Sequence, residues 1–255
     1  MKKTVLREYA KLIVRCGVNV QKGQEVLIFA ELDQPEFVKM VVEEAYKAKA
    51  KKVTVEWNYQ PLGKIHVRYQ SVKTMGAVTD LDKAKQQYHC DVLPCRLLID
   101  SEDPDGLKGM NMKKVAQARQ KTYPIMKGYI DRREGKQQWT IAAVPGKAWA
   151  KKIFPGERTS VAVEKLWQAI LSTSRVVEGQ DSVQAWENHN ADLKKRCDYL
   201  NSLGIEKLHY TADNGTDLTV GMIPEGIFGG GADTSRQGIV YNPNIPSEEC
   251  FTSPM

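Results

Sequence analysis

The residues best suited to chemistry lie in one short run near the end of the 255-residue sequence. Residues 242–254 read Asn-Pro-Asn-Ile-Pro-Ser-Glu-Glu-Cys-Phe-Thr-Ser-Pro. Proline fixes its own φ and disfavours helix in the residue before it, so this run predicts extended backbone. The stretch from Ser247 to Thr252 is also too short for a helix. A carboxylate in such a run has the right chemistry to bind a divalent cation.

Side chains alternate between the two faces of an extended segment, so Glu248 and Glu249 cannot both point into one site. We expect one of them to be a ligand and the other to face solvent or form a salt bridge. If Glu249 is the ligand, the same alternation directs the neighbouring thiol of Cys250 away from the site. The competing interpretation is that the two glutamates are an ordinary solvated surface pair.

A nucleotide site finds no support in the sequence. The first apolar strand ends in Ala30-Glu31-Leu32-Asp33, without the glycine-rich turn that wraps a phosphate group. The glycine cluster at residues 229–231 lies between extended pieces and predicts a bulge or a tight bend. Nucleotide binding is therefore not expected.

The histidines are also poor candidates for catalysis. His66, His89, His189 and His209 are not paired at the spacing of metal ligands. His189 lies in a predicted helix near Trp186, where a packed or capping role is more common than a ligand role. The sequence has no Gly-x-Ser-x-Gly motif, so no catalytic residue is assigned within this chain.

The cysteines indicate a reducing compartment. They are odd in number and scattered, at Cys16, Cys90, Cys95, Cys197 and Cys250, which favours free thiols in a cytoplasmic protein. Cys90 and Cys95 lack a second Cys or His pair to complete a zinc site, so a structural role is the preferred interpretation.

Composition narrows the class of protein. Hydrophobic residues make up 42% and charged residues 27%, as in an ordinary globular chain, and no apolar run is long enough to span a membrane. The N-terminus predicts a helix rather than a signal peptide. The net charge is +6, but the 37 basic and 31 acidic residues are interleaved. Neither a membrane nor a nucleic acid is an expected partner.

Apolar periodicity predicts how the first four-fifths of the chain is built. Apolar strands are expected at 25–30, 52–57, 92–100 and 138–144, and helices at 4–16, 35–48, 112–133, 149–154, 161–174 and 181–203. Residues 58–87 predict mixed helix and loop. Strands that alternate with helices predict an α/β domain over residues 1–204, with a largely parallel sheet flanked by helices.

Three boundaries of these elements depend on turn chemistry. Asp33 is a plausible N-cap for the helix that begins near Pro35. The stretch after residue 48 lacks the glycine that ordinarily ends a helix, so the end of that helix is open. The acidic loop at 101–106 follows a parallel strand and could hold a ligand, but a helix-capping turn is preferred.

The pattern changes after residue 204. Two alternating runs, 205–212 and 217–222, flank Asn214-Gly215, which is a strong signal for a β-hairpin. Antiparallel structure is therefore predicted from residue 205 onward. We expect residues 205–255 to begin a second, antiparallel α+β domain, present here in part.

The run at 242–252 resembles the Asn-Pro-Asn-(Leu/Met/Ile)-Pro-(Thr/Ser)-Glu-Glu-Val-Phe-Thr motif of the aminopeptidase T / aminopeptidase S family of metallopeptidases. The departures are Ser247, where Thr is commoner, and Cys250, where Val is usual. Other short segments are similar to the family and occur in the same order along the chain: residues 22–25, 149 with 154–156, 166–170, 185–187 with 189–190, and 215–218.

The resemblance implies a cytoplasmic, homodimeric aminopeptidase that holds two divalent ions, zinc or cobalt, and acts on peptides with a free N-terminus. Glu249 is the residue that matches a metal ligand in the family motif. Family members continue past the matched region with further ligands, so we expect a truncated chain that is inactive by itself. The alternative hypothesis is a non-catalytic α/β interaction or dimerisation module.

Overall fold

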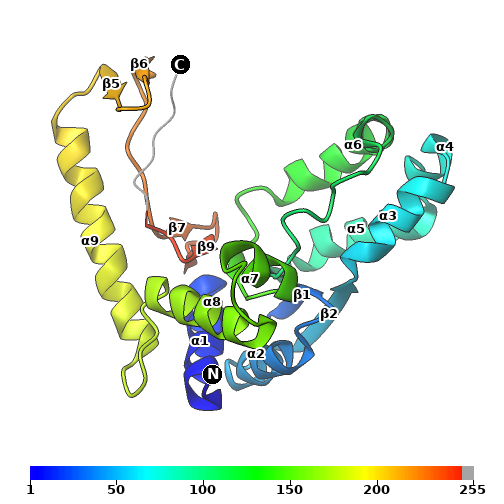
Figure 1. Cartoon of the computed structure of the whole chain (residues 1–255), viewed down its shortest axis with the longest axis horizontal. Coiled ribbons are helices and arrows are strands. Elements are labelled where there is room, and N and C mark those ends of the chain that lie inside the picture. Colours follow the sequence, from blue (N-terminus) through cyan, green and yellow to red (C-terminus); the bar gives the residue numbers. More distant parts are fainter. Residues whose placement is uncertain (249–255) are drawn as a thin grey trace.

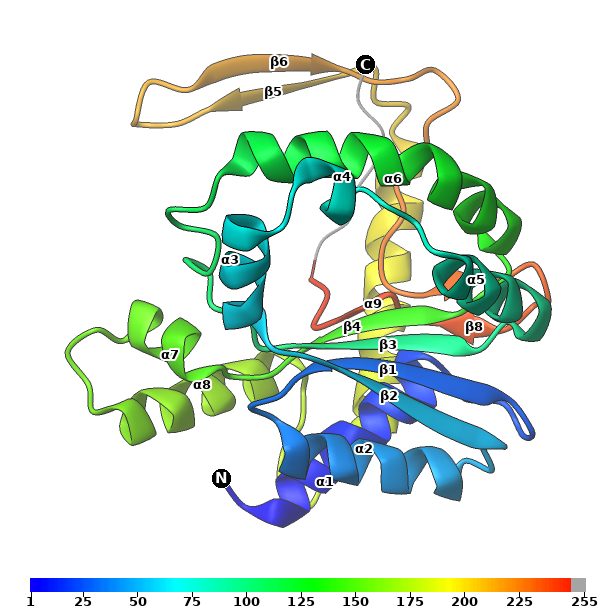
Figure 2. The same cartoon turned by 90° about the vertical axis from the view of Figure 1, so that its right-hand side faces the viewer.

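The computed structural model describes residues 1–248 and has an α/β fold, as predicted (Figure 1). Its main sheet has five parallel strands in the order β2-β1-β3-β4-β9. The strands are β1 (Glu25–Glu31), β2 (Lys52–Asn58), β3 (Cys95–Asp100), β4 (Trp139–Ala143) and β9 (Asn244–Ile245). Figure 2 shows these strands nearly edge-on, with α1 and α2 below them and α3 to α6 on the other side.

The predicted helices are all present, and the region of mixed character resolves into three more. The helices are α1 (Lys3–Leu12), a π-helix η1 (Ile13–Gly17), α2 (Pro35–Lys47), α3 (Gln60–Tyr69), α4 (Val72–Met75), α5 (Asp80–Val92), α6 (Met112–Arg133), α7 (Lys147–Ile153), α8 (Thr159–Thr173) and α9 (Ser182–Ser202). No helix within residues 1–248 is long and apolar enough to cross a membrane.

The core lies between the sheet, α1, α2 and α8. Tyr9 of α1 is fully buried at its centre, stacked on Phe37 at 5.5 Å between ring centroids and edge-on to Trp167 at 6.2 Å. Its hydroxyl donates to the carbonyl oxygen of Ala143 at the end of β4 (2.9 Å). A buried phenol needs such an acceptor, so Tyr9 joins α1 to the sheet.

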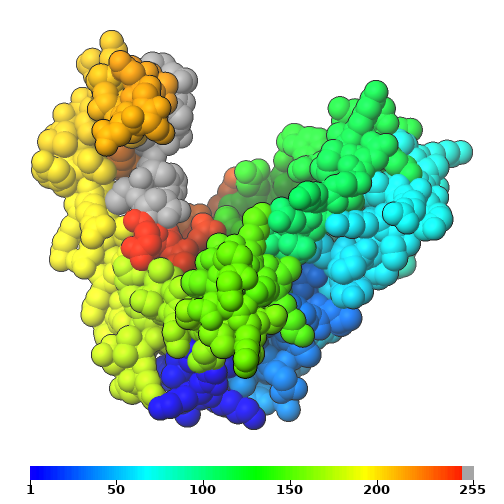
Figure 3. All heavy atoms as spheres, in the orientation of Figure 1, coloured from blue at the N-terminus to red at the C-terminus, as the bar shows by residue number. Residues whose placement is uncertain are grey.

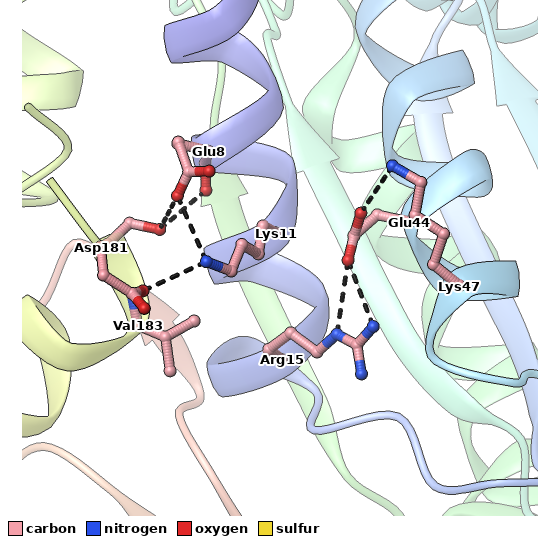
Figure 4. Close-up of polar contacts among 8 residues, drawn as sticks. Glu8, Lys11, Arg15, Glu44, Lys47, Asp181 and Val183 are labelled. Atoms are coloured by element: carbon pink, nitrogen blue, oxygen red, sulfur yellow. Dashed lines mark hydrogen bonds and ion pairs between the residues drawn. The ribbon is translucent and has the colours of Figure 1, made fainter. Parts of the chain in front are cut away.

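Ion pairs hold α1 to its two neighbouring helices (Figure 4). The ammonium of Lys11 lies 3.2 Å from a carboxylate oxygen of Asp181, the residue that caps α9. From η1, which continues α1, the guanidinium of Arg15 lies 3.3 Å from the carboxylate of Glu44 on α2. The charges therefore link the first helix to segments that follow it by about 30 and 170 residues.

The antiparallel part of the prediction is also confirmed. Strands β5 (Lys207–Thr211) and β6 (Asp217–Gly221) form a hairpin around Asn214-Gly215, and Gly215 has φ +90° as the tight turn requires. This ribbon stands at the far end of α9, away from the main sheet (Figure 1). A second pair joins β7 (Asp233–Thr234) to β8 (Val240–Tyr241). The chain then returns to the main sheet as β9, so the domain boundary near residue 205 stays a prediction.

Two of the predicted capping roles are wrong. Gln34, not Asp33, is the N-cap residue of α2, and the carboxylate of Asp33 accepts a hydrogen bond from the hydroxyl of Ser101 (2.8 Å). The loop that begins at Ser101 starts no helix, because α6 begins only at Met112 and is capped by Asn111. The partner of Asp33 lies 68 residues further along the chain, and such a partner cannot be read from local turn chemistry.

The surface is hollowed between two arms (Figure 3). One arm consists of α9 with the β5–β6 ribbon, and the other of α3 to α6. The atoms at the floor of this hollow belong to the last described residues, those of β9 and the segment after it. The fold therefore places residues 244–248, which end in Glu248, at the bottom of an open depression.

Candidate metal-binding segment

The segment at residues 242–248 begins as an edge strand of the main sheet. In β9, Asn244 is paired with Ile141 and Ile245 with Ala142, and the N–H of Ile141 donates to the carbonyl of Pro243 (2.8 Å). Ile245 is only 1% exposed and belongs to the central core. An apolar β-branched residue between prolines thus anchors the run to the sheet.

A second anchor comes from η1 at the start of the chain. The backbone N–H of Asn242 donates to the carbonyls of Gly17 (2.8 Å) and Cys16 (3.1 Å), and its side-chain amide donates to Cys16 again (3.0 Å). These carbonyls lie in the last turn of η1, where a helix leaves its carbonyls without an intrahelical partner. The hydroxyl of Thr140 in turn donates to the carbonyl of Asn242 (2.6 Å). The segment is therefore hydrogen-bonded to both the first helix and the sheet.

Gly17 is the position at which this close approach requires glycine. A Cβ atom there would lie 3.1 Å from the Cγ2 of Thr140 and 3.3 Å from the Cδ1 of Ile245. Both distances are tighter than ordinary side-chain contacts, so a larger residue pushes β9 away from η1. Gly17 is also the last residue of η1, so the end of the first helical segment and its close packing against β9 fall on the same residue.

The third anchor is a histidine of α9. The Nε2 of His189 lies 2.6 Å from the carbonyl oxygen of Ser247, and because a carbonyl only accepts, Nε2 carries the proton. The ring is buried and lies edge-on to Trp186, with centroids 5.0 Å apart. His189 is thus packed and hydrogen-bonded, as the sequence predicted.

The fourth anchor is an ion pair on Glu248 itself. The guanidinium of Arg175 contacts both carboxylate oxygens, at 2.6 Å and 3.1 Å. This hydrogen-bonded cation lowers the pKa of Glu248. The glutamate that is not a ligand is expected either to face solvent or to form a salt bridge. Glu248 forms a salt bridge. Its oxygens are thereby engaged by a protein cation.

Glu249, the predicted metal ligand, lies outside the described residues, and its role stays a prediction. Within residues 1–248, no group of three or more His, Cys, Asp or Glu side chains is arranged to hold a metal ion. A catalytic zinc ordinarily has three protein ligands. The described residues alone therefore do not make a ligand set for zinc or cobalt.

The acidic loop after β3 is the other place where carboxylates gather. Glu31, Asp100 and Glu102 line a cavity of about 430 Å³ at the carboxyl ends of the strands. Burial, together with the charges of Asp100 and Glu31, raises the pKa of Glu102. The carboxylate of Glu31 already accepts from Asn58 and from the backbone N–H of Gln60. Because Glu31 is already engaged and the described residues here form no group of three metal ligands, this cluster is not a preformed cation site.

Sequence reasoning missed Arg175 and Thr140. Each lies more than 70 residues from the segment that it holds, and neither belongs to a motif. The sequence near Arg175 gives one hint of its role: an arginine, and not a glycine, follows the end of a helix. By contrast, His189 lies in one of the short segments already singled out by resemblance.

Comparison with known proteins assigns the chain to a protein family. Residues 2–255 match the family described as Thermophilic metalloprotease (M29), and the chain belongs to this family. The match covers nearly the whole sequence, so it includes both the α/β sheet and the Glu-Glu run.

Individual relatives agree with this assignment. The chain is 34% identical over 251 residues to Aminopeptidase PepS of Streptococcus thermophilus and 33% identical over 252 residues to Aminopeptidase AmpS of Bacillus subtilis (strain 168). A solved structure, wild-type AmpT from Thermus thermophilus, is similar with a TM-score of 0.86 at 31% identity, over 99% of this chain and 62% of that one. In each alignment to the two relatives, 98% of this chain is covered, and it spans 60% of their length.

Proposed function

We propose that this chain provides the first metal-ligand carboxylate, and the scaffold that holds it, in a metal-dependent aminopeptidase. The observation that carries the proposal is the Glu-Glu run of an M29 family member, led into by residues 242–248, which are fixed at four points and end at the floor of the hollow. The relatives that match are themselves named aminopeptidases. Glu249 is the ligand that we assign, because Arg175 engages both oxygens of Glu248.

The chemistry of the centre would come from two divalent ions, for which we propose zinc or cobalt. Such a pair, roughly 3.5–4 Å apart, supplies an activated water and polarises the scissile carbonyl. The part played by this chain is positioning: β9 and the contacts of Asn242, Ser247 and Glu248 hold the backbone that leads into Glu249. We propose peptides with a free N-terminus as substrates, in keeping with the names of the relatives.

We also propose an oligomeric state and a cellular location for the enzyme. A homodimer is proposed from family resemblance, and a cytoplasmic location from the free thiols at Cys16, Cys90, Cys95 and Cys197. We also propose that the second domain begins near residue 205. Because residues 1–248 lack a set of three ligands, we expect these 255 residues alone to bind metal weakly and to lack peptidase activity.

The deciding experiment compares two single variants, Glu249→Gln and the matched Glu248→Gln. Both are made in the product of the longest open reading frame that contains this sequence. Metal content is measured by mass spectrometry, and turnover with a leucine anilide. We expect Glu249→Gln to lose bound metal and nearly all turnover, and Glu248→Gln to keep far more of both, because its amide oxygen can still accept a hydrogen bond from Arg175. Full metal content and turnover in Glu249→Gln would refute the assignment.

The alternative, a non-catalytic α/β interaction module, is favoured by the missing ligand set within residues 1–248. The same experiment separates the two functions. If the wild-type product binds no metal and releases no amino acid, while it self-associates in analytical ultracentrifugation, the interaction module is the better description.

A further inference from the structure

Arg175 occupies a backbone position that ordinarily takes glycine. Helix α8 ends at Thr173, and the next turn closes with the N–H of Val176 on the carbonyl of Leu171 (2.8 Å) and the N–H of Arg175 on that of Ser172 (3.1 Å). These two bonds define a Schellman motif, whose residue after the cap is left-handed and usually glycine. Arg175 adopts this conformation with φ +57°, at a cost in free energy that glycine would avoid.

The side chain of Arg175 has a use that glycine cannot supply. Its guanidinium reaches both oxygens of Glu248, donates to the carbonyl of Thr173 (2.7 Å) and lies over the ring of Trp186, 6.0 Å from Cζ to the centroid. A planar fork that meets a carboxylate at two points fixes its orientation as well as its position. The strained backbone and the bidentate contact thus occur at the same residue.

This contact acts together with His189 on consecutive residues. His189 holds the carbonyl of Ser247, Arg175 holds the side chain of Glu248, and Ile245 is paired into the sheet just before them. The capture of Glu248 fixes which side of the extended chain its side chain takes. In an extended chain, the side chains of consecutive residues point to opposite faces.

We infer that Arg175 is a positioning residue for the metal centre, which acts by clamping Glu248 so that the preceding backbone presents Glu249 as a ligand. This role depends on the proposed function of Glu249, which lies outside the described residues. The competing explanation is that Arg175 merely closes α8 and forms an exposed ion pair, which would contribute little beyond local stability.

The chain offers a matched control for the backbone effect. Lys49 follows α2 in the same motif, with φ +69° and the N–H of Ala50 on the carbonyl of Ala45 (3.0 Å). Its side chain is exposed and forms no ion pair within residues 1–248. Arg175→Gly and Lys49→Gly therefore relieve the same strain, and only the first removes a clamp. Helix α2 thus ends without a glycine because Lys49 takes the left-handed position itself.

The first measurement is amide hydrogen exchange in peptides from residues 239–248. We expect Arg175→Gly to speed exchange there by about tenfold or more, because the segment opens locally without global unfolding. Lys49→Gly is expected to leave this exchange unchanged and to raise the unfolding temperature. Equal exchange in the two glycine variants would overturn the clamp.

The second measurement is the affinity for cobalt(II), titrated by visible absorption in the product of the longest open reading frame that contains this sequence. A residue that orients a ligand ordinarily changes metal affinity by about 10–100-fold, and we expect this loss in Arg175→Gly but not in Lys49→Gly. Arg175→Lys keeps the charge but not the fork, so it should also lose affinity for cobalt.

The outcomes separate the role of Arg175 from the role of Glu249. If the wild type binds cobalt and Arg175→Gly binds it within about twofold, Arg175 is only structural and the inference is overturned. If the wild type binds no cobalt, the proposed function of Glu249 fails, and the positioning role fails with it even where exchange shows a clamp.

Discussion

His189 of α9 donates from Nε2 to the carbonyl oxygen of Ser247, 58 residues further along the chain and 2.6 Å away. This bond fixes the tautomer of the imidazole and supplies the buried carbonyl with its donor. The helix that leads out to the β5–β6 ribbon therefore also holds the segment before the glutamates.

Replacement of this donor should destabilise the fold. His189→Phe keeps the ring and its contact with Trp186 but leaves the carbonyl of Ser247 without its donor, so we expect a loss of about 1–3 kcal/mol in the free energy of unfolding in urea. His189→Gln, which can donate, should recover part of this loss. The exposed His66→Phe is the control, expected within about 0.5 kcal/mol of the wild type. A His189→Phe chain as stable as the control would contradict the importance of this bond.

Gly17 should be sensitive to a single methyl group. In Gly17→Ala the new Cβ meets Thr140 and Ile245, and overpacking of this kind costs about 1–3 kcal/mol. Ile245→Val removes the Cδ1 atom at 3.3 Å, so the double variant should lose less than the sum of the two single variants. Gly63→Ala, in an open position of α3, should instead gain about 0.5–1 kcal/mol. Additive losses in the double variant would show that the two residues do not press on each other.

The ion pair in Figure 4 should appear in the pH dependence of stability. The hydrogen bond from Lys11 and the N–H of Val183 lower the pKa of Asp181 below its ordinary value of 3.8. A lowered carboxyl pKa contributes stability that is present above the unfolded pKa and is lost as pH falls through the folded pKa. The stability difference between wild type and Asp181→Asn should therefore be constant near neutral pH and shrink below pH 3.8.

Asparagine retains the cap of α9, so this substitution isolates the charge. Chemical denaturation at several pH values measures the difference, and added salt should reduce it because the pair is exposed. A difference that grows as the pH falls would have the wrong sign for this pair.

The cysteines should differ in reactivity. Burial raises the pKa of Cys16 and of Cys95 to about 12, so neither forms thiolate at neutral pH. Cys90 is only half-buried, and its thiol donates to the carbonyl of Tyr129 (3.4 Å). We expect iodoacetamide to modify Cys90 in the folded chain, and Cys16 and Cys95 only in denaturant, as read by peptide mass spectrometry. Rapid labelling of Cys95 in the folded state would contradict the packing of β3.

Much of this protein follows from local features of its sequence. The bounds predicted for the helix at 112–133 match α6, the Asn214-Gly215 turn forms its hairpin, and the β-α-β pattern forms a parallel sheet. These elements depend on side-chain periodicity and turn conformation within a few residues, which a single sequence displays directly. The Glu-Glu run can also be recognised in the sequence, and Glu249 stays a predicted ligand.

Only the tertiary structure decided what holds that run in place. The amide of Asn242 meets the carbonyl of Cys16 from 226 residues away, Arg175 takes Glu248 as its partner, and Asp33 bonds to Ser101 instead of capping a helix. Each choice is made between groups that meet only after the sheet has formed and strand β9 has returned to its edge. Local patterns cannot indicate such pairings, because a polar side chain bonds to whatever partner the fold brings within reach.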